Sequence, residues 1–268
     1  TADAYGQLTY SSTVTNGGSV SFSTSVYKVG AASAYFNPVS IGPYAGSYLL
    51  YTLPASLSAP SALTMSCWVY QTAQASNGTP MILNDGNTYG PEFYISATGL
   101  VNFYYATTTA TVGTTLATTS NTSITVNTWN HLVMTYGGGM MTLYVNGVVA
   151  AAAPVTGNLC CQGGGALTRM MVGSAVPNGS VGYNAYKGYV DDIRIYTATL
   201  SPQQVAWLYI SPTTHPSLTI ASNYITSATS PQPTMPLITA NITSAAVSFN
   251  GQVMVATTVA TTNNVYYS

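Results

Sequence analysis

The chain has 268 residues but only four Lys/Arg and five Asp/Glu, so charged residues make up 3% of the sequence and the formal net charge is −1. Ordinary globular chains contain roughly 25% charged residues. A chain with so few cations cannot form the basic patch that nucleic-acid binding or attachment to anionic membranes requires. No uninterrupted apolar run reaches the ~18 residues of a membrane helix, so we also expect no membrane insertion.

Apolar and polar residues alternate in short runs, a period of two that is typical of β-strands. The length of 268 residues suits one large all-β domain plus an extension. The expected strands, in chain order, are 19–23, 32–36, 48–53, 63–71, 80–83, 92–97, 100–105, 168–173 and 188–196. Residues 107–119 form either an edge strand or a loop, and 150–167 form a loop of small residues. Ser201 and Pro202 predict the start of a short helix that ends near Ile210.

Residues 129–149 predict a central β-hairpin. Two alternating runs flank Gly137-Gly138-Gly139, and such a pair of strands around a glycine turn is typical of a hairpin. Asn146-Gly147 indicates a second tight turn, because both residues tolerate a positive φ.

Five segments, in order, resemble the laminin-G-like (concanavalin A-like) lectin/glucanase superfamily. The hairpin and the closing strand match its patterns at Trp129, His131, Leu143, Tyr144, Asn146, Gly147, Gly188, Asp191, Asp192, Arg194 and Tyr196. Residues 27–36, 63–70 and 200–209 resemble two earlier strands of the family and its short closing helix. The resemblance covers roughly residues 20–210, and it implies a laminin-G-like jelly-roll β-sandwich over residues 1–210.

Residues 211–216 predict a Pro-rich linker, and residues 217–268 lie outside the resemblance. This β-rich extension contains no Asp, Glu, Lys or Arg. About 50 residues with few large apolar side chains make a poor independent core, so its strands need a partner sheet. Strand edges without charge lack the usual block to edge pairing. We expect strand exchange with a neighbouring copy, and docking on the chain's own first domain is the alternative.

Glycosidases of the superfamily need two carboxylates about 5–9.5 Å apart. The carboxylates of this chain are scattered, at Asp3, Asp85, Glu92, Asp191 and Asp192, and the Glu-x-Asp-x-Glu strand of the hydrolase members is missing. We interpret Asp85 as a turn residue and Glu92 as an exposed one. The two histidines, His131 and His215, have no Gly-x-Ser-x-Gly elbow with which to form a nucleophile–base pair. We therefore expect no catalytic residues and a protein that is not an enzyme.

One structural calcium ion is the only candidate cofactor. In related jelly rolls an Asp of the closing strand helps to hold calcium, and the matching residue is Asp191. Strand alternation places Asp191 on the face of Ile193 and Ile195, and it pairs Asp192 with Arg194. An Asp on an apolar face needs a metal or hydrogen bonds, so the alternative is an Asp191 bonded to a loop backbone.

Glycan binding usually combines aromatic rings with Asn or Asp side chains. The residues in turns and strands that could form such a site are Asn84, Asp85, Tyr89, Tyr94, Asn102 and Tyr104, with Tyr105 as a neighbour. With 22 Tyr in the chain, many are expected to be packing residues. Four Asn-x-Ser/Thr sequons are candidate glycosylation sites, at Asn77, Asn121, Asn178 and Asn241.

The three cysteines do not form a complete disulfide framework, because their number is odd. Cys67 lies in an apolar strand and is expected to be a buried small hydrophobe. Cys160 and Cys161 are adjacent in a loop, where a bridge between the two, or to another molecule, is left open.

The lack of charge bears on function, because an uncharged surface does not repel its copies. We expect a non-catalytic structural protein at an extracellular, cell or virion surface that assembles with copies of itself and has carbohydrate as a further partner. A glycosylated surface or a general compositional bias would also explain the missing charge. The alternative function is a soluble carbohydrate-binding lectin module without an assembly role.

Overall fold

The computed structural model describes residues 9–14, 18–38, 46–73, 77–109, 116–175, 184–210, 242–247 and 253–258. The chain divides into two compact units, Thr1–Pro212 and Thr213–Ser268, and the boundary falls within the stretch predicted as a linker. In the second unit, β16 (Ile242–Val247) pairs antiparallel with β17 (Val253–Thr258).

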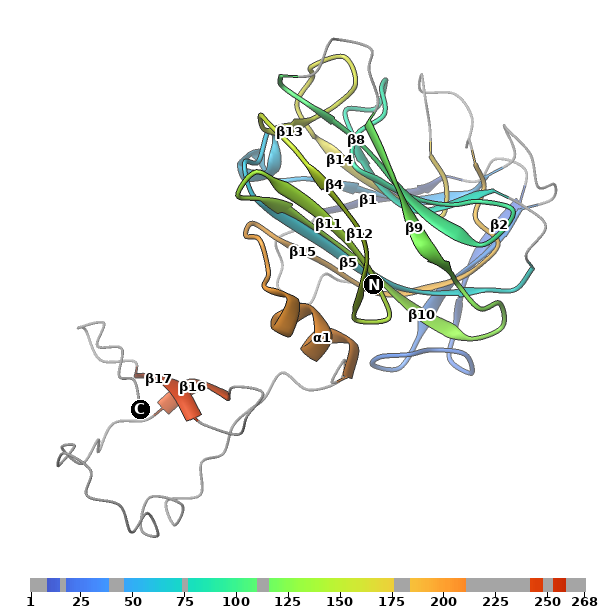
Figure 1. Ribbon diagram of the computed structural model, residues 1–268. Coiled ribbons are helices and arrows are strands. Elements are labelled where there is room, and N and C mark those ends of the chain that lie inside the picture. The colour runs from blue at the N-terminus through green and yellow to red at the C-terminus, as the bar shows by residue number, and fades with distance from the viewer. Residues whose placement is uncertain are drawn as a thin grey trace, which may run out of the picture. The chain divides into compact units, whose positions relative to one another are not determined.

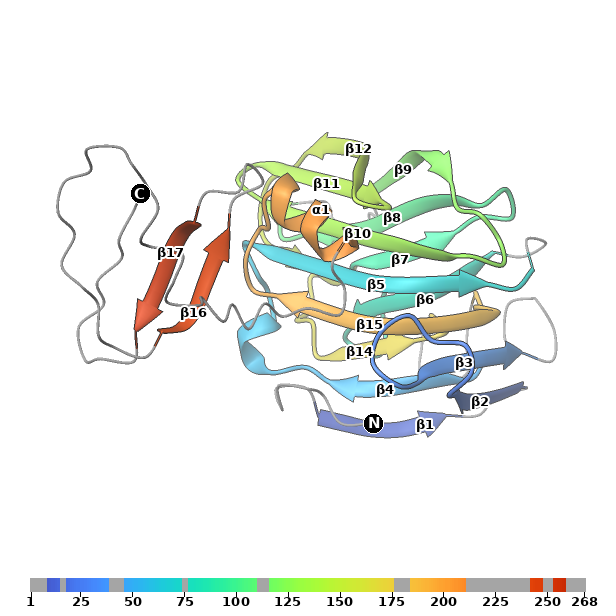
Figure 2. The ribbon, with the colours of Figure 1, turned by 90° about the horizontal axis from the view of Figure 1, so that it is seen from below.

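The first unit is a sandwich of two antiparallel sheets, so the all-β jelly-roll prediction is confirmed (Figures 1 and 2). The eight-stranded sheet has the order β1 (Thr9–Val14), β4 (Tyr48–Thr52), β14 (Arg169–Val172), β6 (Gly78–Asn84), β7 (Glu92–Ile95), β8 (Leu100–Thr107) and β13 (Leu159–Cys160), with β9 (Leu116–Ser123) also paired to β8. The seven-stranded sheet has the order β12 (Val148–Pro154), β11 (Met140–Val145), β10 (Trp129–Gly137), β5 (Leu63–Gln71), β15 (Gly188–Tyr196), β3 (Ser33–Pro38) and β2 (Gly18–Ser23).

The predicted hairpin lies within the seven-stranded sheet as β10 and β11. Gly137 pairs with Met140 across a turn in which Gly138 and Gly139 have φ of 61° and 80°. Asn146 and Gly147 make the next turn with φ of 52° and 79°. Both turns use the left-handed region that Gly and Asn tolerate, and they fix the register of three consecutive strands.

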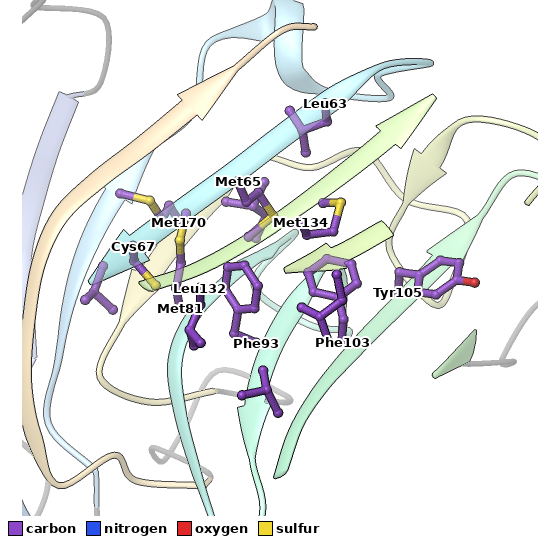
Figure 3. Close-up of a cluster of buried hydrophobic side chains, with 14 of the residues drawn as sticks. Leu63, Met65, Cys67, Met81, Phe93, Phe103, Tyr105, Leu132, Met134 and Met170 are labelled. Carbon is purple, nitrogen blue, oxygen red and sulfur yellow. The ribbon is translucent and has the colours of Figure 1, made fainter. Parts of the chain in front are cut away.

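The core lies between the sheets and is formed by alternate residues of each strand. Figure 3 shows part of it, including Leu63, Met65, Cys67, Met81, Phe93, Phe103, Tyr105, Leu132, Met134 and Met170, all of which are almost completely buried. The intervening residues of the same strands therefore point to the two outer faces of the sandwich.

The predicted helix is α1 (Pro202–Ile210). Ser201 Oγ accepts a hydrogen bond from the Gln204 N–H at 3.3 Å, and Gln204 Oε1 accepts one from the Ser201 N–H at 2.8 Å, so the two residues form a capping box. Val205 packs the helix against Val133 and Tyr144 on the outer face of the seven-stranded sheet. Among the described residues, no helix is long and apolar enough to cross a membrane.

Two stretches differ from the sequence-based expectation. Residues 148–154, expected as part of the hairpin and a loop, form strand β12, because the edge of β11 offers partners from Met140 to Val145. Its Ala-rich sequence has little intrinsic strand preference, so pairing with β11 determines the structure. In the lead-in, residues 9–14 form β1 and pair with β4. Residues 107–119 were expected to form either an edge strand or a loop. They include the start of strand β9 at Leu116.

Candidate functional site

The outer face of the eight-stranded sheet brings together several of the predicted glycan-binding residues. Tyr94 of β7 pairs with Asn102 of β8, and Tyr104 of β8 pairs with Glu92 of β7. Their chain neighbours Phe93 and Phe103 point into the core, so these four residues share the opposite face. The rings of Tyr94 and Tyr104 meet edge to face with centroids 5.4 Å apart. Both rings are half-buried, so each is fixed by packing and still reaches solvent.

Asn102 extends this tyrosine pair with a polar group. Its Oδ1 accepts a hydrogen bond from Thr119 Oγ1 on β9 at 2.5 Å, and its Nδ2 donates weakly to the Leu100 carbonyl at 3.4 Å. The amide is half-buried, whereas Thr119 is exposed. Aromatic edges beside an oriented amide and a hydroxyl are the groups that fix a sugar ring on a protein surface.

Tyr89 belongs to an apolar cluster on the same sheet face. It packs with Tyr48 and Leu50 around Ile82 and Met171, and Ile82 pairs directly with Glu92. The cluster therefore continues the tyrosine pair toward β4.

Asn84 and Asp85 are held by their own surroundings. Asn84 is fully buried, where its Nδ2 donates to Met171 Sδ at 3.2 Å and its Oδ1 accepts from the Gly86 N–H at 3.1 Å. Asp85 closes the following turn, with Oδ1 accepting the N–H groups of Asn87 and Thr88 at 2.8 and 2.7 Å. Although partial burial raises the pKa of Asp85, these hydrogen bonds outweigh it and hold the pKa below its ordinary value. Both side chains thus shape the loop between β6 and β7.

Glu92 is a residue that sequence reasoning placed wrongly. It was expected to be exposed, but only 2% of it is accessible to solvent, and its Oε1 accepts a hydrogen bond from Thr79 Oγ1. Burial raises the pKa of Glu92 to about 7, despite the opposing effect of that bond. The alternation of Glu92, Phe93 and Tyr94 puts Glu92 on the same face as Tyr94. The sequence did not show that strands on both sides pair with β7 and bury Glu92.

A Ser–His pair is present on the opposite outer face but is closed to solvent. Ser66 Oγ lies 2.9 Å from His131 Nε2. The His131 ring stacks on Trp68 and on Tyr209 with centroid distances of 4.7 and 6.2 Å, and Tyr209 also stacks on Trp68 at 5.6 Å. Burial, with the charges of Arg194 and Lys28, lowers the pKa of His131 to about 3. Ser66 is fully buried, so no substrate reaches this pair. The Ser66–His131 hydrogen bond is a buried structural contact beneath helix α1.

The predicted position of Asp191 on the core face is wrong. Asp191 pairs with Trp68 and Arg194 pairs with Ser66, so two residues of β15 oppose Cys67 alone. This β-bulge, in which Asp192 has a φ of 44°, shifts the alternation and puts Asp191 on the outer face, while Ile195 packs in the core. The predicted ion pair is confirmed: Arg194 contacts Asp192 at 2.8 and 2.9 Å.

The Asp191 carboxylate is satisfied by backbone N–H groups. Its Oδ2 accepts from Lys28 and Val29 at 2.7 and 2.9 Å, and its Oδ1 accepts from Asp192 at 2.8 Å. Burial raises the pKa of Asp191, against the effect of these bonds. Calcium prefers a shell of six to eight oxygens, whereas N–H donors surround this carboxylate. No cluster of three His, Cys, Asp or Glu side chains suited to a metal occurs in the described part of the chain. The surroundings of Asp191 therefore do not fit the calcium site that the resemblance implied.

An Asp191→Ala variant is expected to lose about 2 kcal/mol of unfolding free energy, because three partly buried N–H groups lose their acceptor. Chemical denaturation measures this loss, and Thr197→Ala, at an exposed position just after β15, is the control variant. A chelator should leave the melting temperature of the wild-type protein unchanged. A drop with chelator that disappears in Asp191→Ala would instead establish a calcium ion at this residue.

The remaining predicted sites lie on the surface or outside the described residues. Asn77 and Asn121 are exposed, and the Oδ1 of Asn77 accepts a hydrogen bond from the Ala97 N–H at 2.9 Å. Asn178 and Asn241 lie outside the described residues. Cys67, Cys160 and Cys161 are all free and buried, so Cys160 and Cys161 are not bridged to each other.

The family model described as the concanavalin A-like lectin/glucanases superfamily matches residues 45–206. The chain belongs to this superfamily. A comparison with the curated proteins finds no match.

Solved structures share the fold at low identity. Domain 4 of AbnA, an extracellular arabinanase from Geobacillus stearothermophilus in complex with arabinotriose, is 18% identical with a TM-score of 0.50, over 74% of this chain and 87% of that domain. The binding domain of botulinum neurotoxin DC in complex with SialylT is 12% identical with a TM-score of 0.52, over 75% of this chain and 46% of that one. The binding domain of botulinum neurotoxin serotype G is 11% identical with a TM-score of 0.53, over 75% and 46%. At these low sequence identities, the similarity shows a shared fold and nothing further.

Proposed function

We propose that the first unit is a non-catalytic glycan-binding module and that its site is the outer face of β7 and β8. The observation that carries the proposal is the half-buried pair of Tyr94 and Tyr104, with the Asn102 amide held beside it by Thr119. Two proteins of similar fold are described in complex with arabinotriose and with SialylT, which supports a search among glycans.

The arrangement favours binding over hydrolysis. Glu92 is the carboxylate beside the tyrosines, and it is buried and bonded to Thr79. Asp85, the other carboxylate at this end of the sheet, is bonded within its own turn. Neither carboxylate offers the free partner that glycoside cleavage needs.

The experiment is a glycan array that includes arabino-oligosaccharides and sialylated oligosaccharides, followed by calorimetric titration of the best ligand. A Tyr104→Ala variant is expected to bind at least tenfold more weakly, because it loses a fixed aromatic contact on the face. Tyr104→Phe should keep most of the affinity. Tyr27→Ala, which removes a tyrosine from the loop before β3, should bind like the wild-type protein. Equal affinity of Tyr104→Ala and wild type, or release of free sugar during the titration, would refute this assignment.

We further propose that the full chain is a structural component of an extracellular, cell or virion surface and that the second unit links copies. In the described part of that unit, β16 and β17 form a sheet of two strands, and an isolated pair of strands is marginally stable in water. The absence of charge along residues 217–268 leaves strand edges open to pairing. The alternative remains a carbohydrate-binding module that does not assemble.

A further inference from the structure

The outer face of the seven-stranded sheet carries a second group of aromatic residues, separate from the proposed glycan site on the eight-stranded sheet. Trp129 of β10 pairs with Tyr70 of β5, Tyr70 pairs with Tyr189 of β15, and Tyr189 pairs with Tyr35 of β3. Cross-strand partners point to the same face, so the four side chains form one row across four neighbouring strands. Figure 2 shows these strands, β10, β5, β15 and β3, lying in this order. We call this group the aromatic row.

The rings of the aromatic row are in mutual contact. Ring centroids are 5.6 Å apart from Trp129 to Tyr70, 5.6 Å from Tyr70 to Tyr189 and 4.5 Å from Tyr189 to Tyr35. Neighbouring planes are inclined by 66°, 86° and 31°. The row is therefore fixed before any ligand arrives, which lowers the entropic cost of binding. It is also corrugated, so it does not offer one flat plane.

Among the residues that the structure describes, helix α1 and Lys28 cover the next row of the same face but not this one. Trp68 and His131, which are paired across β5 and β10, are buried under Tyr209 of α1 and under Lys28, whose Nζ lies 4.3 Å from the Trp68 ring centroid. By contrast, Trp129, Tyr70, Tyr189 and Tyr35 are all only half-buried. The surface that helix α1 covers therefore stops next to the aromatic row.

The dimensions of the row suit a linear ligand better than a folded protein. Four strands at a spacing of about 4.8 Å give a row about 14 Å long and one side chain wide. Four aromatic side chains of about 150–250 Å² each, already half covered, expose well under the ~800 Å² per partner of a standard protein interface. A chain of several sugar units can follow such a row, packing its C–H groups on the rings and reaching their polar edges.

The charges of this face favour an uncharged ligand. Arg194 is paired with Asp192, Asp191 is bonded to backbone N–H groups, and Lys28 lies over Trp68. We propose that the aromatic row is a second binding surface, for a neutral, unbranched oligosaccharide or polysaccharide chain that lies across strands β10, β5, β15 and β3. Together with the face of β7 and β8, it would give one sandwich two sugar-binding sides.

The test is calorimetric titration of the full chain with cellohexaose, xylohexaose, laminarihexaose and maltohexaose. Trp129→Ala and Tyr35→Ala remove the two ends of the row and are each expected to weaken binding of the preferred hexasaccharide at least tenfold. Tyr35→Phe keeps the ring and should retain most of the affinity. Trp207→Ala, at an exposed tryptophan of α1, should bind this ligand like the wild-type protein. Tyr104→Ala tests whether the first site takes up the same ligand. Unchanged melting temperatures of the Ala variants would show that they fold.

Several results would overturn this proposal. One is the absence of binding to all four hexasaccharides; another is unchanged affinity in folded Trp129→Ala and Tyr35→Ala. Loss of binding in Tyr104→Ala alone would assign the ligand to the eight-stranded sheet, leaving the proposed function intact. If sedimentation shows concentration-dependent association that the row variants abolish, the occupant is a second copy of the chain. Lys187 directly precedes β15 and lies two residues before Tyr189 in the chain. Binding that is limited to acidic polysaccharides and lost in Lys187→Ala would contradict the neutral class.

Discussion

A Glu92→Gln variant is expected to resist denaturant better than the wild-type protein at pH 8 and about equally at pH 5. Burial raises the pKa of Glu92 from its ordinary 4.5 to about 7 in the folded chain. The folded state therefore holds the proton more tightly than the unfolded state, and wild-type stability falls as the pH rises from about 4 to about 7. At ~1.4 kcal/mol per pKa unit, the loss is on the order of 3 kcal/mol. Gln stays neutral and can still accept the hydrogen bond from Thr79.

Asp85→Asn is the matched control, because its pKa is shifted in the opposite direction. Partial burial raises the pKa of Asp85, but the hydrogen bonds of its turn lower it overall. The stability that this carboxylate contributes is present above its ordinary pKa of 3.8 and is lost as the pH falls below it. Asp85→Asn should therefore be less stable than wild type at both pH 5 and pH 8. If Glu92→Gln and wild type lose stability in parallel between these pH values, the buried carboxyl does not carry the effect.

Truncation after Ser211 is expected to leave a folded sandwich that no longer assembles. The first compact unit ends at Pro212, and its two sheets and core lie within the retained residues. The strands that are removed, β16 and β17, form a two-stranded sheet, which needs a further partner to be stable. Circular dichroism should show an unchanged β spectrum, and sizing should show the truncated chain as a monomer while the full chain forms larger species.

A full-length variant shows whether assembly is lost because the second unit is missing or because its strands no longer pair. Ala245 and Ala256 are register partners in β16 and β17, so Ala245→Lys/Ala256→Lys places two like charges opposite each other. This variant should also fail to assemble. Assembly of the truncated chain to the same extent as the full chain, or a full chain that is monomeric at all concentrations, would contradict a linking role for the second unit.

Local patterns in the sequence were enough to predict most of the fold. Strand β5 was predicted with its observed bounds, because nine residues of alternating side chains with bulky and β-branched types leave little choice. Helix α1 was predicted from Ser201 and Pro202, and the capping box forms there. Residues 148–154 were not predicted fully as a strand, because their pairing with β11 is a tertiary interaction.

The candidate sites were less predictable, because they depend on pairing between distant strands. The bulge at Asp192 reverses the face of Asp191, and nothing in the surrounding sequence indicates an inserted residue. The sequence grouped Tyr94 and Tyr104 as candidate residues, but it took the pairing of β7 with β8 to put them on one face, and the sequence could not show that Asn84 is buried. The aromatic row joins Tyr35 to Tyr189, residues far apart in the chain, and only the sheet register brings them together.

The most direct test of the glycan-binding proposal is an NMR titration of the isotope-labelled protein with the best ligand from the array. We expect chemical shifts to change at the amides of Tyr94, Asn102 and Tyr104 and at their neighbours on β7, β8 and β9. The effects should be absent in a folded Tyr104→Ala variant at the same ligand concentration. Shift changes confined to the seven-stranded sheet, or none with any glycan that the array identifies, would contradict a glycan site on β7 and β8.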